Sequence, residues 1–204
     1  RRRRRTRPRR ARRPRPPALL GLGAALGVPT RPSPPPAPAA PTECSAERAM
    51  ASMTRLADEP HSVLDREAHD RARDDIIGMF TDLGYTADVH SDPLFDFSIP
   101  EDKETFDMLS TEQQAAVKDA PAETIVVDVP GKSERTMALM AHYDSVTDSD
   151  GDRARFTSSG GSYGAADDGY GVATIVETLR ALKAEGRQPE NSLKIVITDA
   201  EEIG

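Results

Sequence analysis

The sequence predicts an α/β fold in which helices cover both faces of a mixed, mostly parallel β-sheet. One observation behind this prediction is that short runs rich in Val, Ile and Thr alternate with longer segments whose apolar residues recur at helical spacing. A second is that the strand-like runs are mostly apolar, as expected of buried strands. We expect a tail over residues 1–42 and one folded domain over residues 43–204, truncated at its C-terminal end.

The charged residues also divide the chain into these two parts. Residues 1–42 contain twelve of the 27 basic residues and no acidic residue, which leaves the rest with 15 basic against 34 acidic residues, a net charge of −19. The negative charge of the folded part argues against nucleic acid as its partner, because that charge would repel the phosphates of nucleic acid. The single Cys44 excludes an internal disulfide framework and a cysteine-rich zinc site.

The tail is basic first and apolar afterwards. Residues 1–16 contain eleven Arg, which is typical of a phosphate-binding arm or of a solvated tail. Residues 18–28 form an apolar run that is too short to span a bilayer alone but suits the core of a secretory signal. The Pro-rich residues 29–41 are typical of a cleavage region or a linker. We expect export or membrane association through this segment, with a cytoplasmic location as the alternative.

Two amphipathic helices open the predicted domain. The first is expected to begin behind a Ser45 cap and to end before Pro60, with apolar residues at helical spacing between them. The second is expected over residues 65–83, where apolar side chains share one face, and Gly84 ends it. A strand over residues 85–89 follows.

The remainder of the domain begins with an expected insertion over residues 91–121, where Ser110 and Gln113 form the capping pair of a short helix. After it we expect three strands and one helix, over residues 124–129, 136–142, 171–185 (the helix) and 193–198. Open α/β sheets bind ligands at the carboxyl ends of their strands, so the residues that follow these strands are the candidates for a site.

Imidazole and acidic groups stand at these strand ends. His142 and Asp144 close one strand, Glu201 and Glu202 follow another, and Asp167 lies in a Gly-rich loop before the connecting helix. The three blocks can therefore meet at one edge of the sheet. A neutral His nitrogen together with carboxylate oxygens is ligand chemistry for zinc or a similar divalent ion.

The spacing also indicates how these groups would cooperate. Positions i and i+2 of a strand face the same way, so Asp144 can accept a hydrogen bond from the second ring nitrogen of His142 and fix its tautomer. Asp167 has two oxygens and can bridge two metals. Of Glu201 and Glu202, one can ligate metal while the other moves a proton from the attacking water to the leaving amine. Taken singly, each residue has a plainer interpretation, as a polar strand end, a turn or a solvated pair.

The three blocks, in this order, resemble those of metallopeptidase family twenty-eight, the co-catalytic di-zinc aminopeptidases. That family shows a strand ending in His-x-Asp-Ser, a Gly-Ala-x-Asp-Asp/Asn-x-Ser-Gly loop and a strand ending in Glu-Glu-x-Gly. The matching segments here are His142–Ser145, Gly164–Gly171 and Glu201–Gly204. The resemblance is strong over residues 124–204. Tyr170 departs from it, because the family has a small residue there; the bulky ring either narrows the substrate pocket or points away.

The resemblance implies a role for each matching residue. His142 would ligate one zinc ion, Asp167 would bridge two, and Glu202 would ligate the other. Glu201 would be the general base, and Asp144 would orient His142. The family completes its site with an Asp and a His further downstream, so this piece is expected to bind zinc poorly and to be inactive by itself.

The resemblance also implies the activity, which is removal of N-terminal amino acids from peptide substrates. Weaker similarity at residues 45–50 and 59–62 is to bacterial and vacuolar membrane-associated members. Two alternatives stay open: a non-catalytic, receptor-like relative of the same fold, and a di-zinc amidohydrolase or carboxypeptidase. Substrate choice depends on pocket residues, so fold similarity does not decide among them.

Overall fold

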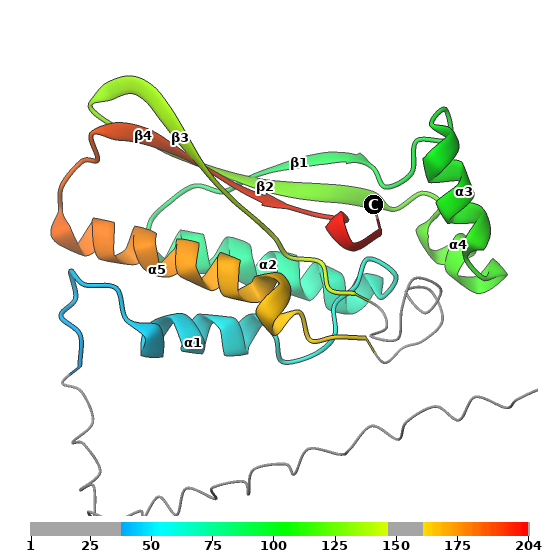
Figure 1. The fold of residues 1–204 in the computed structure, drawn as a ribbon, viewed down its shortest axis with the longest axis horizontal. Helices are drawn as coiled ribbons and strands as arrows, with labels where there is room; N and C mark the ends of the chain where they lie inside the picture. Colours follow the sequence, from blue (N-terminus) through cyan, green and yellow to red (C-terminus); the bar gives the residue numbers. More distant parts are fainter. Residues whose placement is uncertain (1–37, 147–160, 204) are drawn as a thin grey trace, which may run out of the picture. The chain divides into compact units, whose positions relative to one another are not determined.

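The computed structural model describes residues 38–146 and 161–203, which form one sheet with helices packed against it (Figure 1). The sheet has four strands in the order β1-β2-β4-β3. The strands are β1 (Asp88–Pro93), β2 (Pro121–Val129), β3 (Ser133–His142) and β4 (Asn191–Thr198). The helices are α1 (Ala46–Leu56), α2 (Arg66–Asp82), α3 (Pro100–Met108), α4 (Thr111–Val117) and α5 (Tyr170–Glu185).

The α/β class and the mixed sheet are confirmed, but the described strands are not mostly parallel. β1 pairs with β2 and β2 pairs with β4 in antiparallel fashion, and only β3 and β4 are parallel. The connections explain this. A short turn after Val129 reverses the chain between β2 and β3, whereas the α5 crossover returns the chain to start β4 in the direction of β3.

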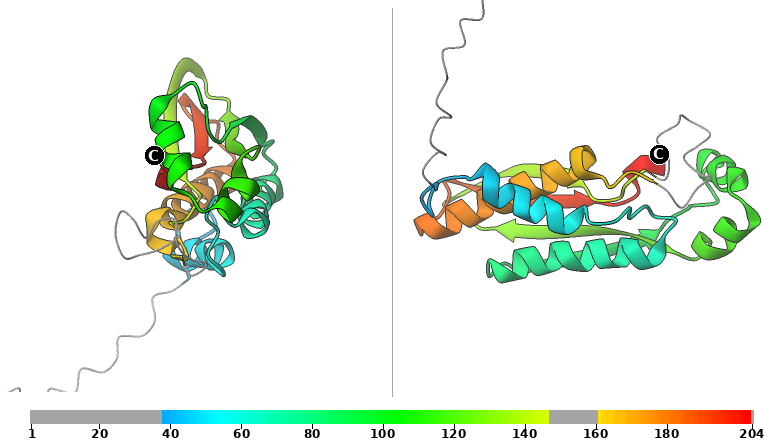
Figure 2. Two further views of the ribbon diagram at one scale, coloured as in Figure 1. Left: turned by 90° about the vertical axis from the view of Figure 1, so that its right-hand side faces the viewer. Right: turned by 90° about the horizontal axis from the view of Figure 1, so that it is seen from below.

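The helices also differ from the expectation that they cover both faces. In the described part of the chain, α1, α2 and α5 lie on the same side of the sheet (Figures 1 and 2). The main core fills the space between these helices and the sheet. Its fully buried members include Ile76, Phe80, Ile125, Leu179 and Ile195. A crossover helix packs on one face of its sheet, and α1 and α2 join α5 there.

The predicted caps at Ser45 and Ser110 are confirmed. The Ser45 hydroxyl accepts a hydrogen bond from the backbone N–H of Arg48 at 3.2 Å, and Ser110 and Gln113 form the reciprocal capping box at the start of α4. α5 begins one residue earlier than expected, at Tyr170. The α3 helix within the insertion was not predicted, since its sequence is mostly polar and Phe106 is its main apolar contact with the neighbouring cluster.

The strand predicted over residues 85–89 is wrong in its bounds, because β1 begins only at Asp88. Tyr85 still belongs to the end of α2, where its backbone N–H donates to the Phe80 carbonyl at 3.0 Å. Gly84 supplies the left-handed conformation for this helix end, with φ of 77°. The apolar Tyr85 thus packs against the core before the strand starts.

The N-terminal described residues are tied to the helices. Arg180 of α5 donates to the carbonyl of Pro41 at 2.6 Å, and Arg48 of α1 donates to that of Ala39 at 3.2 Å. Within residues 38–146 and 161–203, no helix is both long enough and apolar enough to cross a membrane. The predicted basic arm and apolar signal-like run fall within residues 1–37, outside the described part, and stay predictions.

Candidate metal centre

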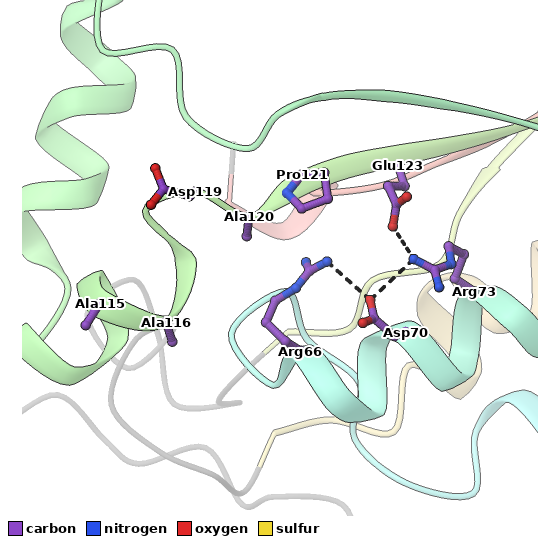
Figure 3. Close-up of a pocket in the computed structure, with 9 residues that line it drawn as sticks. All are labelled: Arg66, Asp70, Arg73, Ala115, Ala116, Asp119, Ala120, Pro121 and Glu123. Carbon is purple, nitrogen blue, oxygen red and sulfur yellow. Dashed lines mark hydrogen bonds and ion pairs between the residues drawn. The ribbon is translucent and has the colours of Figure 1, made fainter.

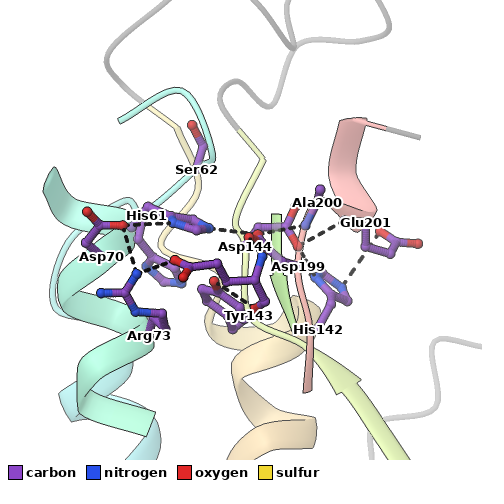
Figure 4. A network of polar contacts seen from close by, with 12 residues as sticks. His61, Ser62, Asp70, Arg73, His142, Tyr143, Asp144, Asp199, Ala200 and Glu201 are labelled. Atoms are coloured by element: carbon purple, nitrogen blue, oxygen red, sulfur yellow. Dashed lines mark hydrogen bonds and ion pairs between the residues drawn. The ribbon is translucent and has the colours of Figure 1, made fainter. Parts of the chain in front are cut away.

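The parallel pairing of β3 and β4 brings the predicted site residues together. His142, the last residue of β3, lies opposite Thr198, the last residue of β4. Parallel strands end at the same edge, so the Glu201 turn that follows β4 lies beside His142 (Figure 4). Asp167 reaches the same place from the loop before α5, and its Oδ1 lies 3.2 Å from His142 Nε2.

The two ring nitrogens of His142 face different surroundings. Nε2 faces the acidic groups, with Glu201 Oε2 at 3.9 Å in addition to Asp167. Nδ1 faces Asp144, whose backbone carbonyl lies at 3.1 Å and whose carboxylate Oδ1 lies at 3.4 Å. In the absence of metal, hydrogen bonding to Asp144 and then to Asp167, against the opposing effect of burial, raises the pKa of His142 to about 10. This arrangement leaves Nε2 as the nitrogen available to a metal.

The buried carboxylate of Asp144 also holds the acidic turn, which consists of Ala200, Glu201 and Glu202 after β4. Its Oδ1 accepts the backbone N–H of Glu201 at 3.1 Å, and its Oδ2 accepts that of Glu202 at 3.0 Å. Sequence reasoning missed this role, because the bonds join positions that are far apart in the chain. Asp144 therefore links the end of β3 to the turn after β4, beyond its predicted task of orienting His142.

The residues at this edge fit a divalent cation. Ligand atoms of His142, Glu201 and Glu202 all lie within 4.8 Å of one another. Burial and then the nearby carboxylates of Asp167 and Asp144 raise the pKa of Glu202, so its anionic form is less favourable here than in water. A divalent cation among these groups would offset the concentration of negative charge, and one imidazole nitrogen with several carboxylates is a zinc donor set.

Three of the predicted ligands and the predicted base thus converge, while their division of labour stays a prediction. Both Glu201 and Glu202 lie within the cluster, whereas Asp167 approaches it from the side with its side chain 83% exposed. The number of zinc ions and the bridging role of Asp167 stay predictions. Tyr170 is 64% exposed, and both alternatives for its ring, narrowing the substrate pocket or pointing away from it, stay predictions.

The loop that carries Asp167 is placed by its backbone. Gly164 has a φ of 62°, and a Cβ there would lie 3.0 Å from the Ser145 Cβ and 3.3 Å from His61 Nε2. At the far end of the loop, Asp168 Oδ1 accepts the backbone N–H of Gly171 at 3.0 Å, which anchors the start of α5. Glycine at position 164 therefore serves both the turn and the close packing.

Two buried histidines outside the predicted set contact residues next to the site. The backbone N–H of His61 donates to Ser145 Oγ at 2.9 Å, which ties the segment before α2 to the end of the His142 motif. His69 of α2 contacts Asp199, the residue before the acidic turn, at 2.7 Å. A His within an amphipathic helix carries no sequence signal for such a contact, since the partner is 130 residues away.

A second group of charges lines a pocket between α2, α4 and the start of β2 (Figure 3). There Asp70 pairs with Arg66 at 3.2 Å and with Arg73 at 3.5 Å, and Arg73 also pairs with Glu123. The residues that line this pocket differ from the acidic cluster, which consists of His142, Glu201 and Glu202 with Asp167 beside them. Glu123 nevertheless links the two, because its backbone N–H donates to Asp199 Oδ2 at 2.8 Å.

Comparisons with known proteins agree with the geometry. Residues 124–204 match the model of peptidase family M28. Leucine aminopeptidase 1 of Pyrenophora tritici-repentis is 34% identical over 85 residues, covering 40% of this chain and 20% of that protein. The crystal structure of Tannerella forsythia glutaminyl cyclase is 26% identical with a TM-score of 0.58, covering 78% of this chain and 48% of that one.

A third relative shares the fold. The Zn-dependent exopeptidase of Parabacteroides distasonis has a TM-score of 0.58 at 20% identity, covering 81% of this chain and 50% of that one. This chain therefore spans about half the length of the solved structures and matches about a fifth of the curated relative. The family match begins within β2 and contains the predicted site residues, which are His142, Asp144, Asp167, Glu201 and Glu202. Over residues 124–204, this chain is similar to peptidase family M28, whose model it matches there.

Proposed function

We propose that the full-length protein is a zinc-dependent peptidase that removes N-terminal amino acids from peptides. The observation that carries the proposal is the convergence of His142, Glu201 and Glu202 within 4.8 Å, with Asp167 beside them, at the carboxyl edge of the sheet. The family match and the similarity to a leucine aminopeptidase support a peptidase. The Zn-dependent exopeptidase that shares the fold supports zinc as the metal.

The residues present would hold zinc through His142 Nε2, Glu202 and Asp167. When bound, zinc polarises a substrate carbonyl and makes water nucleophilic at neutral pH. Asp144 keeps the His142 ring in place through Nδ1, so Nε2 stays directed at the acidic groups.

Glu201 is the residue we assign to proton transfer. Its side chain is 61% exposed, which lets the carboxylate reach a substrate from the rim of the cluster. It would take a proton from the attacking water and pass it to the leaving amine. The Glu201 backbone N–H donates to Asp144, and this bond fixes the position of the backbone that carries the Glu201 carboxylate.

The activity test is a panel of three substrates offered to the full-length protein with zinc and after chelation. An aminopeptidase releases the amino acid from aminoacyl anilides and spares N-acyl amino acids, whereas an amidohydrolase does the reverse. The Glu201→Gln variant is expected to keep its zinc and to lose activity by roughly 10²–10⁴-fold. Zinc binding without turnover of any substrate would instead support the receptor-like alternative.

Glutaminyl cyclase activity is the second candidate, because a glutaminyl cyclase is 26% identical over most of this chain. The third substrate is therefore a peptide with an N-terminal glutamine. Ring closure at that residue, with no release of amino acids from the anilides, would favour the cyclase over the peptidase. Both reactions begin at a free N-terminus, so the panel separates them by product.

We also propose that the protein acts outside the cytoplasm or at a membrane, through the apolar run at residues 18–28. Fractionation of cells that express the full-length protein tests this. Deletion of residues 18–28 should move the protein into the cytoplasmic fraction, and an unchanged distribution would contradict the proposal.

A further inference from the structure

A buried His–Asp pair stands directly behind the acidic turn. His69 Nε2 lies 2.7 Å from Asp199 Oδ1, and both side chains are 0% exposed. A carboxylate can only accept, so Nε2 carries the proton of this bond. Burying a carboxylate away from water is costly, and its hydrogen bonds do little more than offset that cost. The presence of this pair therefore calls for a reason other than stability.

The Asp199 carboxylate also accepts hydrogen bonds from backbone N–H groups around the turn. Oδ1 also accepts the N–H of Ala200 at 2.8 Å, and Oδ2 accepts the N–H of Glu123 at 2.8 Å. Burial pushes the pKa of Asp199 upward, but the bonds from His69 and these two amides outweigh it, and the pKa lies below its ordinary value. The carboxylate thus accepts from His69, Ala200 and Glu123, and the Tyr143 side chain also interacts with it.

The turn that Asp199 holds has an unfavourable backbone. Ala200 has a φ of 61°, the left-handed region that a residue with a Cβ rarely adopts. Such a conformation persists only where surrounding contacts impose it, and it is found often at functional sites. The Ala200 conformation turns the chain out of β4 toward Glu201 (Figure 4). Glu202 is the next residue of the same short helical turn.

The acidic turn is therefore held at both ends. Asp144 accepts the N–H groups of Glu201 and Glu202, and Asp199 accepts that of Ala200. The His69 ring also packs against Tyr143, the residue between His142 and Asp144, with ring centroids 4.9 Å apart. One histidine thus contacts both strand ends that contribute to the acidic cluster.

We propose that His69 and Asp199 are positioning residues for the metal centre, fixing the Ala200 corner so that Glu201 and Glu202 meet His142 before metal arrives. The zinc-binding role of the pair rests on the proposed function, whereas the hydrogen bonds that fix the Ala200 corner do not depend on it. Preorganised ligands bind metal more tightly than ligands that must be ordered on binding. Loss of the pair should therefore weaken zinc binding in a protein that is still folded.

The main test is Asp199→Asn in the full-length protein. An amide has one acceptor oxygen, so its NH₂ group must face either the Glu123 N–H or the side shared by His69 and Ala200. We expect zinc affinity, measured by competition with a chromophoric chelator, to fall by about 10–100-fold per folded molecule. We also expect faster hydrogen exchange at the amides of Ala200, Glu201 and Glu202.

Glu177→Gln is the matched control. Glu177 is another buried carboxylate, which accepts the Ser45 N–H at 2.7 Å and pairs with Arg180 at 2.6 Å between α1 and α5, away from the turn. This variant should lower thermal stability without changing zinc affinity or exchange at Ala200–Glu202. A general structural role for Asp199 would make the two variants alike in all three measurements.

Two further variants keep the test decisive if Asp199→Asn folds poorly. His69→Gln leaves both backbone bonds of Asp199 in place and should weaken zinc binding less. Adding Ala200→Gly to Asp199→Asn should restore part of the zinc affinity, because glycine adopts a positive φ without strain. Zinc affinity and amide exchange that match the wild type in a folded Asp199→Asn protein would overturn the inference. A wild type that binds no zinc would contradict the proposed function, and amide exchange would still decide whether the pair fixes the corner.

Discussion

The acidic turn after β4 and the Gly164 loop before α5 both bring carboxylates to the same edge, but they are held by different means. Buried side-chain carboxylates, Asp144 and Asp199, hold the turn by accepting its backbone N–H groups. The loop depends on glycine geometry and on one bond from the Gly171 N–H to its own Asp168, and the side chain of its Asp167 is mostly exposed. The turn is therefore the preorganised part of the site, and the loop places its ligand without fixing that ligand's side chain.

The largest effect is expected from removing the carboxylate that serves the turn. Asp144→Ala leaves the part-buried amides of Glu201 and Glu202 without their charged acceptor, at about 1.5–3 kcal/mol for each hydrogen bond. It also frees the His142 ring. We expect zinc affinity to fall by about 10–100-fold, as for the loss of a residue that orients a ligand. Chelator competition measures the affinity, and denaturant unfolding measures the stability. An unchanged affinity would show that the turn does not depend on Asp144.

A smaller effect is expected in the loop, at Gly164. Gly164→Ala combines a left-handed backbone with a Cβ only 3.0 Å from that of Ser145. The control is Gly186→Ala, where φ is also positive but no atom lies within 4 Å of the new Cβ. Backbone strain alone costs roughly 1–2 kcal/mol, and we expect Gly164→Ala to lose more. Equal losses in denaturant unfolding would mean that the packing against Ser145 is not tight.

A pH effect should distinguish the metal-free site from the rest of the molecule. Hydrogen bonding to Asp144 first, and the other acidic neighbours, raise the pKa of His142 to about 10. A raised His pKa contributes stability that is fully present below the ordinary value of 6.5 and is lost as pH rises toward 10. The zinc-free protein should therefore unfold more easily as pH rises through this window. His142→Gln should flatten that slope, and an equal slope in both proteins would contradict the assignment.

The smallest effect is expected from Tyr170, whose side chain is exposed beside the loop. Tyr170→Ser introduces the small residue that metallopeptidase family twenty-eight has at this position, and it removes no buried contact. We expect stability to change by no more than about 0.5 kcal/mol, as for most surface substitutions. A change in KM for bulky aminoacyl substrates without a change in stability would show that the ring borders the substrate pocket.

Much of this molecule could be predicted from local patterns. Helix caps such as Ser45 and Ser110 lie within a few residues of the amides they bind, so their signals are readable in the sequence. The meeting of His142 with the Glu201 turn followed from a general rule for strand ends. The antiparallel pairing of β2 with β4 was not predicted, because apolar strand runs do not specify direction.

The supporting contacts were out of reach for the opposite reason. In the sequence, Asp199 is simply a polar residue at the end of a strand, and His69 is one of many polar residues in a charged helix. Only the packing of α2 against the sheet joins them. The same holds for the second role of Asp144, whose acceptor bonds run to amides in a turn more than fifty residues on. Sequence patterns identified the groups that carry the chemistry, and tertiary structure supplied the residues that hold those groups in place.

The most direct test of the central claim is anomalous diffraction at the zinc edge from crystals of the full-length protein. The account predicts a zinc peak at the carboxyl edge of β3 and β4, about 2.0–2.2 Å from His142 Nε2 and from carboxylate oxygens of Glu202 and Asp167. Zinc bound elsewhere, or no peak at this edge after zinc is supplied in excess, would contradict it.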